Sequence, residues 1–155
     1  MPLHVVLYEP EIPPNTGNII RLCANAGAHL HLIEPLGFEL DDTRLRRAGL
    51  DYHEFAEVQV HRDLDIFRHT VQPARLFAIS TRGRCSTHAV SYRDNDALLF
   101  GPESRGLPQA VRDELGEDHV LRIPMRSDQR SLNLSNAVAI VLYEAWRQLE
   151  FTGGG

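Results

Sequence analysis

The sequence predicts an α/β fold in which helices cover both faces of a parallel β-sheet. Short apolar runs alternate along the chain with longer segments whose apolar residues recur every three or four positions. Runs of the first kind are typical of buried strands, and segments of the second kind are typical of amphipathic helices. Strands that alternate with helices indicate a parallel sheet.

The expected strands are short and are bounded by turn-forming or charged residues. The first of them, LHVVLY, is followed by the proline-rich stretch EPEIPP, which favours a turn directly after the strand. The five expected strands span residues 3–8, 29–34, 74–80, 96–100 and 119–124. The stretch LDYHEFAEVQV (50–60) has only a loose pattern, and we assign no element to it.

The expected helices lie between these strands. The first spans residues 15–28, where Gly27 is a suitable C-cap. Residues 41–49 begin with acidic side chains and end with arginines, an order that suits the dipole of a short helix. The remaining helices are expected over 62–71, over 108–115 and from near Ser135 onward.

The last expected helix carries apolar residues on more than one face. The stretch SLNLSNAVAIVLYEAW (131–146) opens with polar residues and then runs apolar almost without a break. A helix that is apolar on all sides must be covered on all sides, and so large an exposed stripe is unfavourable on a monomer. We therefore expect a homodimer that buries this helix.

Length and composition indicate one domain in a reducing compartment. A chain of 155 residues, 43% of them hydrophobic, suits a single domain over residues 1–150, and the end of the chain (151–155) is expected to be disordered. The longest uninterrupted apolar run, 137–143, is too short for a membrane span, so we expect a cytoplasmic protein without a membrane partner. The two cysteines lack CxxC spacing, which favours reduced thiols.

The charge pattern excludes several functions. A net charge of −5 argues against coating of nucleic acid by bulk charge, although a local basic patch remains open, and no DNA partner is expected. All 16 basic residues are arginine, so a P-loop lysine and Schiff-base chemistry are excluded. His29 and His31 lie two apart without a third ligand of fixed spacing, so no metal site is expected.

The loops that follow three of the strands are candidates for a binding site. Ligands of open α/β sheets bind at the carboxyl ends of strands, where STRGR, GPESRG and PMRSDQRSLNLSN follow the runs 74–80, 96–100 and 119–124. Gly101 directly follows a strand and would let a ligand approach the backbone, although an ordinary glycine turn is the alternative. The dinucleotide fingerprint GxGxxG is absent.

Three stretches together resemble a known family. NTGNIIR (15–21), LLFGPESRGLP (98–108) and RIPMRSDQRSLNLSNAVAIVLYEAW (122–146) resemble, in order and spacing, the three motifs of the SPOUT superfamily of RNA methyltransferases. The opening YEPEIPPNTGNIIRLCANAG and the stretch RRAGLDYHEF (46–55) are similar to its TrmL-like branch, the tRNA wobble-position 2'-O-methyltransferases. The resemblance extends to about residue 149.

This resemblance implies a fold, a reaction and partners. The fold would be a SPOUT-like parallel sheet flanked by helices, with a C-terminal trefoil knot. The reaction would transfer a methyl group from S-adenosyl-L-methionine, without a metal, to the wobble nucleotide of a tRNA anticodon loop, which is a cytidine or a carboxymethylaminomethyluridine. The expected assembly is a homodimer.

The resemblance also implies roles for particular residues. The loops at Ile79, Gly101, Ile123, Met125 and Ser131 would hold S-adenosylmethionine. Arg21 matches the family's catalytic arginine, and because guanidinium stays protonated we expect it to stabilise charge or orient phosphate rather than act as a base. Tyr143 lies two turns after Asn136 on one helical face, so it is a second catalytic candidate.

Arginines in the expected loops and in the charged short helix are candidates for contacts with the RNA backbone. They are Arg44, Arg46, Arg47, Arg82, Arg84, Arg126 and Arg130. Three other functions stay open: a catalytically silent RNA-binding dimer, a methyltransferase of another RNA position, and a nucleotide-binding α/β enzyme that merely shares the turn glycines.

Overall fold

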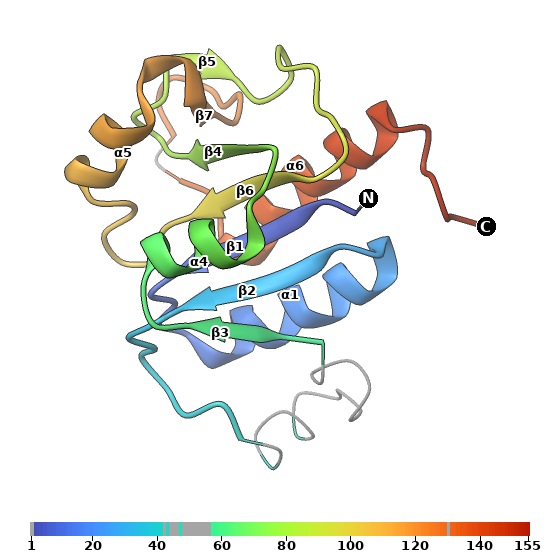
Figure 1. Cartoon of the computed structure of the whole chain (residues 1–155). Helices are drawn as coiled ribbons and strands as arrows, with labels where there is room; N and C mark the ends of the chain where they lie inside the picture. Colours follow the sequence, from blue (N-terminus) through green and yellow to red (C-terminus); the bar gives the residue numbers. More distant parts are fainter. Residues whose placement is uncertain (1, 42, 44–46, 48–56, 130) are drawn as a thin grey trace.

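A seven-stranded sheet forms the centre of the computed structural model, which describes residues 2–41, 43, 47, 57–129 and 131–155 (Figure 1). Its strand order is β3-β2-β1-β6-β4-β7-β5, and every pairing between neighbours is parallel. The strands are β1 (His4–Tyr8), β2 (His29–Ile33), β3 (Gln59–His61), β4 (Arg75–Ile79), β5 (Cys85–Ser86), β6 (Asp96–Phe100) and β7 (Val120–Arg122). The predicted parallel sheet is therefore confirmed.

Two strands were missed, β3 and β5, and both lie at an edge of the sheet. β3 has three residues and β5 has two, and their sequences, QVH and CS, carry almost no apolar pattern. Short polar strands at a sheet edge give no periodic signal, because only one side of each is paired and little of each is buried.

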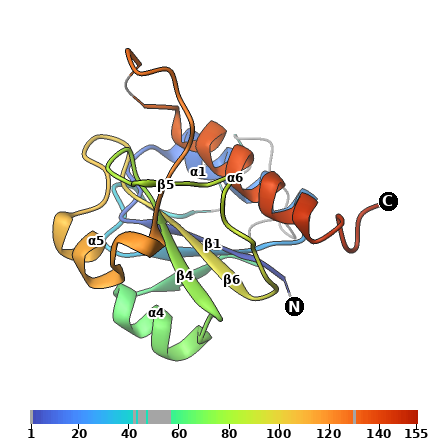
Figure 2. The same cartoon turned by 90° about the horizontal axis from the view of Figure 1, so that it is seen from above.

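Helices cover both faces of the sheet, as the sequence predicts. α1 (Pro13–Ala26) and α6 (Leu134–Gln148) pack against each other on one face, and α4 (Leu64–Val71) and α5 (Gln109–Leu115) cover the other (Figure 2). A short 3-10 helix, Glu117–His119, precedes β7. The helix expected over 41–49 lies largely outside the described residues.

The ends of the helices follow from local chemistry. α1 begins two residues before the predicted start because Pro13 and Pro14 fit the first turn of a helix, where a missing N–H costs nothing. It ends as predicted at Gly27, whose φ of 71° is the left-handed conformation of a C-cap. α4 begins after Asp63, whose carboxylate accepts a hydrogen bond from Ile66 N at 2.8 Å.

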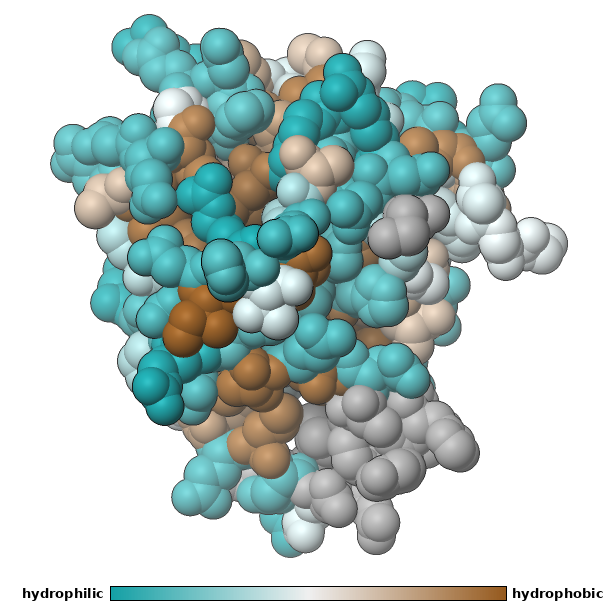
Figure 3. All heavy atoms as spheres, in the orientation of Figure 1, coloured by the Kyte–Doolittle hydropathy of each residue, from teal (hydrophilic) through white to brown (hydrophobic). Residues whose placement is uncertain are grey.

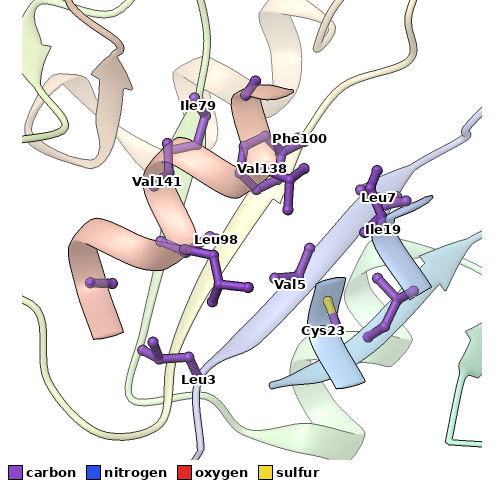
Figure 4. Packing of buried hydrophobic residues seen from close by; sticks show 14 of the residues in the cluster. Leu3, Val5, Leu7, Ile19, Cys23, Ile79, Leu98, Phe100, Val138 and Val141 are labelled. Carbon is purple, nitrogen blue, oxygen red and sulfur yellow. The ribbon is translucent and has the colours of Figure 1, made fainter. Parts of the chain in front are cut away.

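The larger hydrophobic core lies between the sheet and the pair α1 and α6. Figure 4 shows Val138 of α6 beside Phe100, Val141 of α6 beside Ile79 and Ile19 of α1 beside Leu7, all in one cluster with the central strands. Burial of such residues supplies most of the free energy that holds a parallel sheet together.

α6 is not covered on all sides within one chain. Val138, Val141 and Leu142 are fully buried, whereas Ile140 and Tyr143 each remain 39% exposed. The single chain therefore buries one face of this helix and leaves an apolar strip on another.

Residues 151–155, for which the sequence predicts disorder, are exposed and contact the end of α6. The indole N–H of Trp146 donates to Thr152 O at 3.0 Å, and the ring of Phe151 meets that of Trp146 edge-on at 5.1 Å. Gly154 N also donates to Phe151 O at 2.8 Å, which closes a turn. An aromatic contact gives this glycine-rich segment an anchor that its composition does not reveal.

A buried ion pair joins β6 to β4. Asp96 is fully buried at the start of β6, and its carboxylate accepts hydrogen bonds from Arg75 Nε at 3.0 Å and Arg75 Nη2 at 2.6 Å. The backbone N–H of Arg93 donates to the same carboxylate at 2.8 Å. A bidentate pair with an additional donor satisfies the charge that folding removes from water.

Candidate functional site

A cavity of about 610 Å³ lies at the carboxyl ends of β4 and β6 and beside the segment that follows β7. These three strands are neighbours or next-neighbours in the sheet, so the loops that leave them meet at one edge. All five residues predicted to hold S-adenosylmethionine line this cavity: Ile79, Gly101, Ile123, Met125 and Ser131. The structure therefore brings together residues from three separate stretches of the sequence.

The floor of the cavity depends on a tight return of the chain onto Gly101. A Cβ at this position would lie 2.3 Å from Leu107 N and 2.5 Å from Gly106 C. The space beside Gly101 is thus filled by the chain's own backbone, whereas the sequence suggested space for a ligand. Gly106, with a φ of 69°, makes this return possible.

A second close approach of two backbones lies in the loop that follows β4. A Cβ on Gly83 would lie 2.5 Å from Leu121 C, so the loop after β4 passes directly over the backbone of β7. Arg122, the last residue of β7, donates from Nη1 to Thr81 O in the same loop. These contacts hold the loop that carries Ser80, Thr81 and Arg82 into the cavity wall.

A chain of polar side chains connects the three motif stretches. The carboxylate of Glu103 accepts hydrogen bonds from the backbone N–H groups of Glu11 and Ile12, each at 2.8 Å, and from Asn15 Nδ2 at 3.3 Å. Asn15 Oδ1 in turn accepts from Asn133 Nδ2 at 3.2 Å. A carboxylate at the first turn of α1 is electrostatically favourable, because the N–H groups there lack partners within the helix.

Asn133 completes this connection as the N-cap of α6. Its Oδ1 accepts from Ser135 N at 2.9 Å and from Ser135 Oγ at 2.7 Å. Glu103, Asn15 and Asn133 all line the cavity, although none of them is among the site residues predicted from the sequence. Their signal was present, because each is a polar residue inside one of the three motifs.

The turn before α1 is fastened to the loop after β6 by two further contacts. Glu11 accepts hydrogen bonds from Ser104 N at 2.8 Å and Ser104 Oγ at 2.7 Å, and these bonds lower the pKa of the Glu11 carboxyl. Arg105 Nη2 lies 2.7 Å from Glu9 Oε1. Both pairs are at the surface and contribute modestly to stability, but together they fix the orientation of one cavity wall.

The lining of the cavity suits a molecule with an apolar ring, polar edges and charged groups. Ile79, Phe100, Ile123 and Leu134 provide apolar surface, and Arg82, Arg112 and Glu103 provide charge. Backbone groups at the ends of β4 and β6 can bind the edge of a base. Such a mixture fits S-adenosylmethionine, which joins an adenosine to a charged amino acid. Within the described residues, no group of three or more His, Cys, Asp or Glu side chains is placed to hold a metal ion.

The two predicted catalytic residues do not line this cavity. Arg21 lies on an exposed position of α1, where it does interact with other groups. Tyr143 was expected to reach the cavity along the face of α6 that carries Asn136, but its ring instead meets the ring of Trp146 edge-on at 5.4 Å. Both side chains are on the surface of the layer formed by α1 and α6.

Only some of the arginines predicted to contact RNA lie among the described residues. Arg44, Arg46 and Arg130 lie outside the described residues. The others are all exposed, namely Arg47, Arg82, Arg84 and Arg126. Arg82 lines the cavity, and Arg84 Nη1 lies 3.5 Å from Glu117 Oε1, so these two have different surroundings. No described helix is long and apolar enough to cross a membrane.

Comparison with known proteins gives consistent matches over the whole fold. A tRNA (cytidine(34)-2'-O)-methyltransferase of Yersinia pestis is 62% identical to the chain, over 97% of the chain and 96% of the relative. A solved structure concerned with the 2-OH methylation of C/U34 on tRNA superposes with a TM-score of 0.87 and 48% identity, over 96% of each chain.

A third match carries a bound ligand. The SpoU methyltransferase AviRb from Streptomyces viridochromogenes, in complex with the cofactor AdoMet, has a TM-score of 0.81 and 27% identity, over 99% of this chain and 59% of that one. The model of the SpoU rRNA Methylase family matches residues 2–143. The predicted resemblance to RNA methyltransferases is thereby confirmed, and the chain belongs to the SpoU rRNA Methylase family.

Proposed function

We propose that the chain is a tRNA ribose 2'-O-methyltransferase that uses S-adenosylmethionine to methylate the wobble nucleotide, cytidine or carboxymethylaminomethyluridine 34. The observation that carries the proposal is the cavity that gathers Ile79, Gly101, Ile123, Met125 and Ser131 at one edge of the sheet. The name of the Yersinia pestis relative, which covers nearly the whole chain at 62% identity, supports the nucleotide and the position.

The reaction breaks the bond between the sulfonium sulfur and its methyl group and forms a bond between that methyl group and the ribose 2'-oxygen. The proton of the 2'-hydroxyl leaves as the new bond forms, and an in-line approach of oxygen, methyl and sulfur is required. The chain's contribution is to hold the donor between the loops at Gly101 and Ser131 and to lower the energy of the developing negative charge on oxygen.

Arg21 is assigned the stabilisation of that charge, or the orientation of a neighbouring phosphate. A guanidinium remains protonated at any physiological pH, so it acts as a positive charge and a hydrogen-bond donor rather than as a base. Tyr143 is assigned a position beside the reacting ribose. Neither residue lines the cavity of its own chain, and we assign both roles to a second chain that brings its own Arg21 and Tyr143 to the cavity.

The second chain is a copy of the first, docked on the α1 and α6 layer. Ile140 and Tyr143 leave an apolar strip there, each 39% exposed, and a homodimer would bury it. Light scattering at micromolar concentration tests the assembly directly. A stable monomer would remove both the dimer and the proposed two-chain site.

Mixing two inactive variants tests the two-chain site more sharply. Arg21→Ala keeps an intact cavity, and Asn133→Leu breaks the contact with Asn15 and removes the N-cap of α6 beside the cavity. If Arg21 acts across the interface, a mixed dimer has one intact cavity served by one intact Arg21, so activity returns on mixing. No return of activity, with mixed dimers shown by mass spectrometry, would place Arg21 and the cavity in the same chain.

A C-terminal trefoil knot is also part of the proposal. β7 lies between β4 and β5, which precede it in sequence, so the chain returns into a gap between earlier strands. The close passage of Gly83 over Leu121 lies at this return. Gln148, at the end of α6, donates to Val90 O and accepts from Tyr92 N at 2.9 Å each, so the end of α6 is fastened to the loop before β6.

Contacts with the anticodon loop are assigned to the exposed arginines, of which Arg82 and Arg126 belong to the loops that follow β4 and β7. A phosphate backbone is bound by such side chains without reading sequence, so affinity should fall with salt. We assign the reaction to the cytoplasm, where tRNA is available, with no role for DNA.

The decisive experiment is methyl transfer to defined tRNA. Purified protein with radiolabelled S-adenosylmethionine should label a tRNA with cytidine 34 and should not label the same tRNA with 2'-deoxycytidine 34. Labelling of the deoxy tRNA would mean another position or another atom. Binding of S-adenosylmethionine and tRNA without any labelling would favour the catalytically silent alternative.

A further inference from the structure

Three buried histidines form one continuous chain of hydrogen bonds across the sheet. His4 Nδ1 lies 3.0 Å from His31 Nε2, and His31 Nδ1 lies 3.0 Å from His61 Nε2. The three residues come from the neighbouring strands β1, β2 and β3, and they are only 6%, 1% and 7% exposed. They lie on the face that α4 covers, away from the α1 and α6 layer.

The direction of this chain is fixed at one end by Asn95. Asn95 Oδ1 lies 2.7 Å from His4 Nε2, while Asn95 Nδ2 donates to Gln72 O at 3.3 Å. The amide oxygen can only accept, so His4 must carry its proton on Nε2. His4 Nδ1 then accepts from His31 Nε2–H, and His31 Nδ1 accepts from His61 Nε2–H. All three rings are therefore neutral Nε2–H tautomers.

With this arrangement of protons, neither of the two hydrogen bonds between the histidine rings can accept an additional proton. A proton added to Nδ1 of His4 or His31 would face another N–H across 3.0 Å. His61 Nδ1 is the one nitrogen of the three rings with no hydrogen bond among the described residues. Within the described part of the molecule, Asn95 therefore occupies one end of the histidine chain, and the other end is Nδ1 of His61, the last residue of β3.

Phe67 of α4 covers the chain. Its ring meets His31 edge-on at 4.8 Å and His61 at 5.3 Å, and it is itself fully buried. Figure 3 shows that the outer surface on this side of the molecule is largely hydrophilic, with separate hydrophobic areas. α4 has only eight residues, so its attachment to the sheet depends on Phe67 and few other side chains.

Among the described residues, none of the three rings pairs with a carboxylate. A titratable neighbour within this part of the chain is His29, whose ring stacks on His4 at 5.5 Å and adds repulsion if charged. On α4 and its flanks, Asp63 caps the helix, Arg68 pairs with Glu114, and Arg62, Asp65 and His69 are exposed. Asp96, next to Asn95, is held by Arg75.

We propose that the histidine chain is an acid-sensitive lock that holds β3 and α4 onto the sheet and releases them when the rings take up protons. Protonation begins at His61 Nδ1, and an imidazolium there is buried against Phe67 with no carboxylate partner among the described residues. Opening of β3 and α4 lets water reach the rings, and His31 and His4 can then be protonated as well. Opening of β3 and α4 is therefore coupled to the uptake of more than one proton.

The sign of the pH dependence follows from burial. Burial lowers the pKa of His31 to about 3, with further lowering by His4, His61 and His29, and burial also lowers the pKa values of His4 and His61. The opened rings regain the ordinary value of about 6.5. Closure is therefore fully favourable above about pH 6.5 and weakens as the pH falls below it, by about tenfold per pH unit for each ring that is protonated on opening.

Hydrogen exchange resolved by peptide tests the lock in the unmodified protein. We expect the backbone amides of β3 and α4 to lose protection by more than about tenfold between pH 7 and pH 5.5, after correction for intrinsic exchange. The amides of β4 and β6 should keep theirs over this range. Equal loss in all strands, or unchanged protection of residues 59–71, would overturn the proposal.

A variant of the proton entry point separates the lock from ordinary acid unfolding. In His61→Gln the amide nitrogen can still donate to His31 Nδ1 but takes up no proton, so the loss of protection should shift to lower pH. His69→Gln, at an exposed histidine of α4, is the matched control and should behave like the unmodified protein. An identical pH dependence in His61→Gln would contradict the entry point.

Nitrogen NMR of the unmodified protein tests the protonation of the three rings without any substitution. At pH 7.5 the three rings should appear as neutral Nε2–H tautomers, with Nε2 protons that exchange slowly for His4 and His31. An Nδ1–H tautomer or an imidazolium at any of the three positions would refute the chain itself.

Discussion

Replacement of Gly101 by alanine should test how the cavity is built. The added Cβ would lie 2.3 Å from Leu107 N, whereas ordinary contacts begin at 3.4 Å, so the backbone of residues 106–107 must move by about 1 Å. Overpacking of this kind costs about 1–3 kcal/mol. For a chain of 155 residues each kcal/mol lowers the melting temperature by about 2–4 °C, so we expect a decrease of about 2–12 °C.

The same displacement should weaken the binding of S-adenosylmethionine, because Gly106 and Leu107 line the cavity. If the substitution destabilises the complex with S-adenosylmethionine by about 1.4 kcal/mol relative to the free protein, calorimetry should show an affinity about tenfold lower. Gly116→Ala is a matched control: its φ of 86° makes alanine unfavourable, but its Cβ meets nothing within 4 Å and the residue lies outside the cavity lining. Normal affinity in Gly101→Ala at a lowered melting temperature would refute the link between this loop and the site.

Three further predictions rest on separate features. Arg21→Ala should lower turnover by about 10²–10³-fold with S-adenosylmethionine affinity unchanged, and Arg21→Lys should recover part of the loss; full activity in Arg21→Ala would remove this residue from the mechanism. Asp96→Asn should lower the free energy of unfolding by about 3–5 kcal/mol in urea titrations, because Asp96 is fully buried against Arg75; a loss below 1 kcal/mol would show that the pair is dispensable. Cys23, whose pKa burial raises to about 12, should resist thiol reagents at pH 8 until the chain unfolds, while half-buried Cys85 reacts first; the reverse order would contradict the packing of α1.

Hydrophobic periodicity was sufficient for the elements that build the core. β1, β2, β4, β6 and β7 are apolar runs that lie inside the sheet, and their burial imposes the pattern that the sequence reveals. β3 and β5 left no such pattern, because an edge strand of two or three residues needs few apolar side chains. The contact between Trp146 and Phe151 could not be predicted either, since it depends on a local turn rather than on composition.

The site was predictable to the extent that it lies in loops after strands. Gly101 and Ser131 could be placed at one edge because parallel strands all end there. The link from Glu103 through Asn15 to Asn133 could not, because it joins side chains about 90 to 120 residues apart in sequence. Whether Tyr143 reaches the cavity depends on how α6 is rotated, and an amphipathic pattern leaves that rotation uncertain near the edge of the apolar face.

The link from Glu103 through Asn15 to Asn133 also sets when the site can exist during synthesis. The cavity is lined by the start of α1, the loop after β4, the loop after β6 and residues between 123 and 137. A nascent chain that has folded β1 to β6 therefore lacks the last of these walls and has no complete cavity for the methyl donor. Completion of the site coincides with docking of the last helix, so truncated chains would not sequester S-adenosylmethionine.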